Sequence, residues 1–80
     1  MKILKFSAEW CQPCKMLQKT LDEMALPYPV ENVDIDKFPD VAGEFGIRGL
    51  PTLVLITSEG TEQGRLVGGQ TKADIMEWVS

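Results

Sequence analysis

The stretch Trp10-Cys11-Gln12-Pro13-Cys14-Lys15 contains both cysteines of the 80-residue chain. Just before it, residues 3–6 are short and apolar, which predicts a β-strand. Just after it, Leu17, Leu21 and Met24 recur at helical spacing, on the face that also carries Cys14. The helix should begin near Cys11, where a first-turn proline is tolerated, and end before Pro27. A Cys-x-x-Cys pair between a strand and a helix predicts an α/β fold with thiol chemistry at this junction.

Working outward, the rest of the chain alternates between strand and helix patterns. We expect strands at 30–36, 52–57 and 64–67, the second central and the last at an edge. A short helix should cover 39–45 and end at Gly46. The stretch from Thr71 to Asp74 has the pattern of a capping box, with Asp in place of the usual Glu. It should open a last helix with its inner face at Ile75, Met76 and Val79.

The order β-α-β-α-β-β-α predicts one domain over residues 1–80. The first βαβ unit should be parallel and right-handed, and the short turn after Thr57 should make the last two strands antiparallel. The expected architecture is a four-stranded mixed β-sheet flanked by three helices, with helices on both faces.

Composition excludes several classes of function. The net charge of −4 argues against a nucleic-acid partner, since phosphate binding needs a cationic face. No apolar run is long enough for a membrane span or a signal peptide, so we expect no membrane association and a cytoplasmic, reducing location. With two cysteines and no histidine, nucleophile–histidine catalysis is excluded, and neither a resident metal nor another cofactor is expected.

The spacing of the cysteines suggests a division of roles. Residues i and i+3 lie on one side of a helical turn, so the two sulfurs can form a disulfide. Cys11 would sit at the helix N-terminus, where free amides and the helix dipole favour its thiolate. Cys14 belongs to the apolar face and should be more buried. We therefore expect Cys11 to attack a substrate disulfide and Cys14 to resolve the mixed disulfide.

Three segments resemble the thioredoxin family. Residues 8–15 resemble its active-site stretch, with Gln12 where the family usually has Gly. Residues 45–53 resemble the segment around its cis-proline, and residues 67–69 its glycine-bearing turn. The similarity covers nearly the whole chain, although the extra N-terminal strand and helix of full-length thioredoxins are missing and the length is nearer that of glutaredoxin. The resemblance implies a thioredoxin-like fold and a thiol–disulfide oxidoreductase active in electron transport and cell redox homeostasis.

The resemblance also implies a substrate site around the cysteines. The Leu50–Pro51 peptide should be cis and lie beside them, leaving the Leu50 backbone free to pair with an extended substrate segment. Trp10 should form a surface flap, and Gly68 should keep a groove open. Four more residues are expected to support the site, namely Gln12, Pro13, Lys15 and Thr52. Gln12 and Pro13 lie between the cysteines and tune the reduction potential. Lys15 adds a nearby positive charge, and Thr52 follows the proline.

Two departures from the family concern proton transfer. Lys5 stands where thioredoxins usually carry a buried Asp, thought to assist proton transfer from the resolving thiol. Asn32 stands near the position of the lysine usually paired with that Asp. Water, Lys5 or Glu9 could take over this role. An unpaired buried lysine is costly, so Lys5 should either reach outward or titrate low.

The leading hypothesis is a monomeric protein disulfide reductase that receives electrons from a reductase of the thioredoxin-reductase type. One alternative is a glutaredoxin-like enzyme with glutathione as donor. Another is a partner-binding subunit whose redox chemistry is incidental, and a last one is a dimer bridged by a metal or an iron–sulfur cluster.

Overall fold

The computed structural model describes residues 1–80 and contains four strands and three helices. In chain order these are β1 (Lys2–Ser7), α1 (Gln12–Asp22), β2 (Val30–Asp34), α2 (Pro39–Glu44), β3 (Thr52–Ile56), β4 (Glu62–Val67) and α3 (Lys72–Val79). The expected order is thus confirmed. Most boundaries differ from the expected ones by one or two residues.

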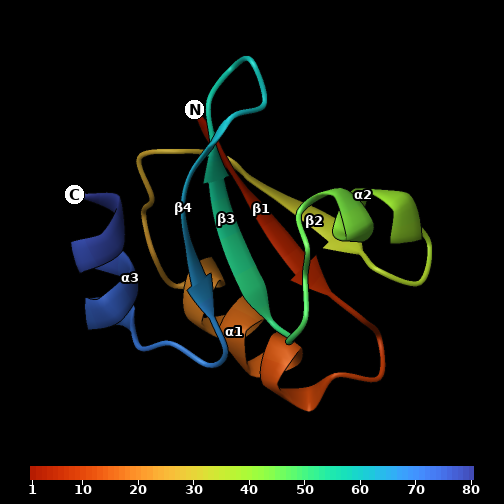
Figure 1. Cartoon of the computed structure of the whole chain (residues 1–80). Coiled ribbons are helices and arrows are strands. Elements are labelled where there is room, and N and C mark those ends of the chain that lie inside the picture. The colour runs from red at the N-terminus through yellow and green to blue at the C-terminus, as the bar shows by residue number, and fades with distance from the viewer.

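A single mixed sheet runs through the molecule in the order β2-β1-β3-β4 (Figure 1). β1 pairs with β2 in parallel and with β3 antiparallel, and β3 pairs antiparallel with β4. All five residues of β3 are buried, as expected for an apolar inner strand. β4 is an edge strand, also as expected.

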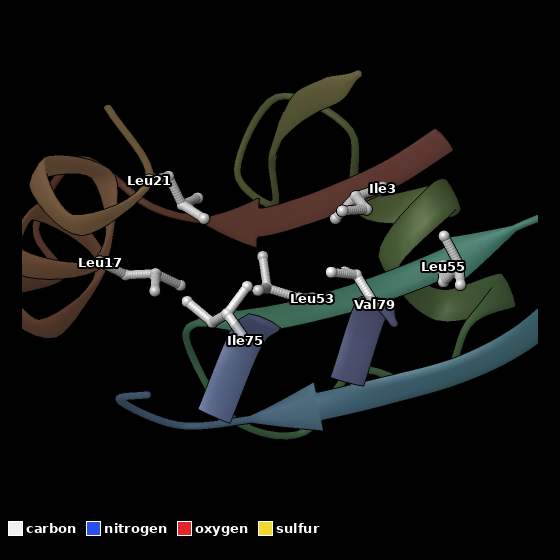
Figure 2. Close-up of a cluster of buried hydrophobic side chains, with 7 residues drawn as sticks. All are labelled: Ile3, Leu17, Leu21, Leu53, Leu55, Ile75 and Val79. Atoms are coloured by element: carbon white, nitrogen blue, oxygen red, sulfur yellow. The ribbon is translucent and has the colours of Figure 1, made fainter. Parts of the chain in front are cut away.

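The helices cover both faces of the sheet, and each face has its own core. On one face, α1 and α3 pack their leucine, isoleucine and valine side chains against the inner strands (Figure 2). This cluster consists of Ile3, Leu17, Leu21, Leu53, Leu55, Ile75 and Val79. On the other face, partly buried residues of α2 and the segment after it pack against Leu4, Phe6, Val33, Val54 and Ile56. The alternation of β1 and β3 side chains between the two clusters follows from the strand period of two.

Two details of the helices differ from expectation. α1 ends before Pro27 as expected, but it already stops at Asp22, so Met24 packs against the core from the segment that follows and not from the helix. In α3 the capping box of Thr71 and Asp74 is present, but Met76 is 48% exposed, so its placement on the inner face was wrong. Ile75 and Val79, four apart, define the buried stripe, and the next residue is turned about 100° away from it. None of the helices is long and apolar enough to cross a membrane.

Candidate active site

The two cysteines lie at the start of α1, shortly after β1 ends, and they form a disulfide with a Cα–Cα distance of 5.3 Å. Cys11 is the N-cap of α1 and has an extended backbone, whereas Cys14 lies inside the first turn. The Cys14 backbone N–H donates to the Cys11 sulfur over 3.2 Å. In the oxidised protein this sulfur is a disulfide atom that stands in for the thiolate of the reduced form. A helix N-terminus that offers an amide to it stabilises that thiolate.

Burial separates the two sulfurs less than the sequence suggested. Cys14 is the more buried, as expected, but Cys11 is only 5% exposed against 2% for Cys14. The two residues differ more in what they face. Cys11 lines a groove of about 550 Å³, whereas Cys14 lines a separate cavity of about 450 Å³.

The groove beside Cys11 brings together several of the expected site residues. Trp10, Gln12, Pro13 and Leu50 line it. Further lining residues that the sequence did not single out come from the end of β2, from α2 and from the segment before Pro51, namely Ile35, Ala42, Ile47, Arg48 and Gly49. Three of these, residues 47–49, belong to the segment that resembles the cis-proline region, so that resemblance could have found them.

Pro51, expected to bind substrate, follows a cis peptide bond and is buried, and it does not line the groove. Its neighbour Leu50 lines the groove and packs against the two cysteines. Leu50 belongs to no helix or strand, and neither its N–H nor its carbonyl pairs with another group of the chain. The buried Thr52, which follows Pro51 in the chain, donates its hydroxyl to the Gly49 carbonyl over 2.7 Å. The Pro51 carbonyl accepts the Gly68 N–H over 2.8 Å, and Gly68 has a φ of +86°, which favours glycine. Gly68 thus anchors the Pro51 backbone from the turn after β4, and it does not line the groove.

Trp10 is an exposed rim residue. It is 68% exposed, more than any other large hydrophobic residue, and its indole Nε1 donates to Asp36 Oδ2 over 3.0 Å. Asp36 was not among the site residues expected from the sequence. Since β1 and β2 are parallel, their carboxyl ends meet at one edge, and this could have placed Asp36 beside Trp10.

The cavity beside Cys14 is polar, and Lys5 forms part of it. Lys5 is 4% exposed, and its Nζ donates to Gln18 Oε1 over 2.8 Å and to Asn32 Oδ1 over 3.4 Å. Burial lowers the pKa of Lys5, an effect that the Asp22 carboxylate opposes. Lys5 therefore does not reach out into solvent. Lys15 lies on this side as well, so it lines the cavity of Cys14 and not the groove of Cys11.

No three His, Cys, Asp or Glu side chains of the chain lie together as a metal site would require. The chemistry that the site displays is that of the disulfide itself. A dithiol at this position can exchange with another disulfide: one sulfur attacks, and the second displaces the product.

Comparison with known proteins also indicates thiol–disulfide chemistry. The thioredoxin family model matches residues 1–80. The thioredoxin of Chlamydia muridarum is 41% identical over 81 residues, covering 98% of this chain and 78% of that protein. The thioredoxin of Rickettsia felis is 34% identical over 82 residues, covering 98% and 77%.

Solved structures agree with the sequence relatives. Mitochondrial thioredoxin 3 from Saccharomyces cerevisiae, in its oxidized form, superimposes with a TM-score of 0.83 at 31% identity, covering 96% of this chain and 74% of that one. Fasciola hepatica thioredoxin gives a TM-score of 0.84 at 26% identity, covering 96% and 75%. The chain thus belongs to the thioredoxin family of thiol–disulfide oxidoreductases.

Proposed function

We propose that this oxidoreductase reduces protein disulfides with Cys11 as the attacking thiolate and Cys14 as the resolving thiol. The observation that carries the assignment is the position of Cys11 at the N-cap of α1, where the Cys14 amide donates to its sulfur. The groove beside it supports the same assignment, because the unpaired backbone groups of Leu50 can bind an extended substrate segment as an added strand.

The reaction proceeds in two exchanges. The Cys11 thiolate attacks one sulfur of the substrate disulfide, and the other substrate sulfur leaves as a thiolate that takes up a proton from solvent. The Cys14 thiolate then attacks the Cys11 sulfur of the mixed disulfide. The Cys11–Cys14 bond forms, the bond to the substrate sulfur breaks, and that sulfur leaves as a thiolate that takes up a proton from solvent.

Trapping the mixed disulfide tests the two roles. Cys14→Ser should accumulate a covalent complex with a disulfide-bearing protein such as insulin, whereas Cys11→Ser should form none and lose reductase activity. Non-reducing electrophoresis and mass spectrometry measure both outcomes. Efficient trapping through Cys14 in the Cys11→Ser variant would reverse the roles.

We propose a thioredoxin-reductase-type enzyme as electron donor, because the chain matches thioredoxins over its whole length. Insulin reduction should proceed with NADPH and a thioredoxin reductase. Reduction that proceeds only with glutathione and its reductase would identify the other donor.

We further propose that the protein acts as a monomer in a cytoplasmic, reducing compartment. A dithiol reductase needs surroundings that return its cysteines to the thiol form, which supports this location. Sedimentation analysis should give the mass of one chain, and alkylation in intact cells followed by fractionation should find the protein mostly reduced in the cytoplasm. A stable dimer, or protein recovered mainly oxidised, would contradict this part of the proposal.

A further inference from the structure

Lys5 is a buried lysine that lines the same cavity as Cys14. Lys5 lies in the middle of β1, opposite Asn32 of β2 and Leu53 of β3. The strand period places it on the same face as Ile3, which packs under α1 in the core. The Lys5 side chain therefore lies on the face of the sheet that is covered by α1, the helix that carries Cys14.

The ammonium of Lys5 has neutral hydrogen-bond partners. Its acceptors are the amide oxygens of Gln18 and Asn32, and the Asn32 oxygen also accepts the Ser7 hydroxyl over 2.8 Å. No ion pair within 4.0 Å joins Lys5 to a carboxylate. A positive charge in this place is therefore not neutralised by a direct partner.

Lys5 and Cys14 line the same open cavity of about 450 Å³. The other charged groups around it come from the loop after β1, from α1, and from the end of β2 and the turn that follows. Four of them line the cavity, namely Glu9, Lys15, Asp34 and Lys37. The fifth, Asp22, acts on Lys5 from further along α1. Of the three lysines, Lys5 is buried and the other two are exposed, so the field of Lys5 is the least screened by solvent.

We infer that Lys5 is the positioning residue of the resolving step: its positive charge stabilises the Cys14 thiolate across the shared cavity. No hydrogen bond joins Lys5 to either sulfur, so it acts through its field. The Cys14 proton leaves to solvent through the cavity, and the resulting thiolate attacks Cys11 as described above. The inference rests on the proposed roles of the two cysteines.

Stopped-flow reaction with 5,5′-dithiobis-(2-nitrobenzoate) isolates this step. With reduced protein in excess over the reagent, the attack of Cys11 releases one thionitrobenzoate in a phase that depends on concentration. The attack of Cys14 on the mixed disulfide releases the second in a phase that does not. The rate of the second phase over a pH series reports the ionisation of Cys14.

Lys5→Met removes the charge and keeps an unbranched side chain. If the pKa of Cys14 rises by about one unit, the thiolate fraction at neutral pH falls about tenfold, while the remaining thiolate becomes about threefold more nucleophilic. The second phase should therefore slow about threefold near pH 7, have its midpoint about one pH unit higher, and match or exceed the wild-type rate on the alkaline plateau. Such a crossing of the two profiles is not produced by a looser structure. Lys5→Arg should keep the midpoint near the wild-type value.

Two further variants sharpen the test. Lys37→Met removes an exposed lysine of the same cavity and should leave the profile unchanged. Asn32→Asp, at an exposed position, places a carboxylate against the Lys5 ammonium and should raise the midpoint even if Lys5→Met fails to fold.

Superimposable profiles for Asn32→Asp and wild type would overturn the inference and leave the roles of the cysteines standing, as would an equal shift in Lys37→Met. Absence of any second phase in the wild type would instead overturn the division of roles on which the inference rests.

Discussion

At the scale of single residues, the two sulfurs of the site have different surroundings. Cys11 caps a helix, receives an amide hydrogen bond and faces the groove lined by Leu50. Cys14 faces a polar cavity that holds Lys5. Exposure alone would not distinguish them, since both are buried in the disulfide form. The proposed division of roles therefore rests on which groups each sulfur faces.

Lys5 gives a pH-dependent contribution to stability. Burial lowers its pKa in the folded protein, whereas the unfolded chain keeps a value of about 10.4. Between these two pKa values the unfolded chain binds more protons, so the free energy of unfolding rises with pH through this window. We expect the stability of wild type relative to Lys5→Met to increase as pH rises toward about 10. Urea titrations at several pH values measure the difference.

The control for this titration is Lys37→Met, which removes a lysine at an exposed position. Its stability relative to wild type should not show the same rise. If the difference between wild type and Lys5→Met stayed constant over the whole pH range, the folded protein would hold Lys5 at its ordinary pKa.

At the scale of helices and strands, patterns within one segment were the most predictable from sequence. The capping box at Thr71, the stop at Gly46 and the apolar run of β3 each rest on neighbouring residues, and all three were correctly located. The face of α3 was predicted less well, because Met76 is apolar and sits beside the buried stripe, and only the sheet decides which residues it covers. The pairing of Trp10 with Asp36 and the hydrogen bonds of Lys5 depend on strand register, which no local pattern specifies.

The N-cap of α3 gives a prediction for one element. The Thr71 hydroxyl accepts the Asp74 N–H over 3.1 Å, and the Asp74 carboxylate accepts the Thr71 N–H over 3.2 Å. Thr71→Ala should therefore lower the free energy of unfolding by about 1 kcal/mol. Thr61→Ala, at an exposed threonine whose hydroxyl makes no hydrogen bond, is the matched control. Chemical denaturation that finds equal losses for the two variants would contradict the role of the cap.

At the scale of the whole molecule, the inner strands β1 and β3 contribute side chains to both cores. Leu53 is 1% exposed and belongs to the cluster that α1 and α3 cover (Figure 2). It lies on β3, which begins directly after Pro51. The same strand turns Val54 to the other face, toward the α2 side. Packing of the helices on β3 thus fixes the position of α1, whose first turn carries the cysteines, relative to the segment that contains Leu50.

Truncation of this core side chain should destabilise the entire domain. We expect Leu53→Ala to lower the free energy of unfolding by about 2–5 kcal/mol, through lost burial and the cavity left behind. Met76→Ala, at a half-exposed position, should change it by only about 0.5 kcal/mol. Similar losses for the two variants in denaturant titrations would mean that the core is not packed as described.

The pH dependence of Cys11 alkylation in the reduced protein tests the whole account most directly. Iodoacetamide modification followed by mass spectrometry gives the rate at each pH for Cys11 alone. A helix N-terminus that stabilises the thiolate predicts a midpoint near pH 7, about 1.5 units below the pKa of about 8.5 of a free cysteine. A midpoint at the free-cysteine value, or no modification of Cys11 until the protein unfolds, would contradict the account.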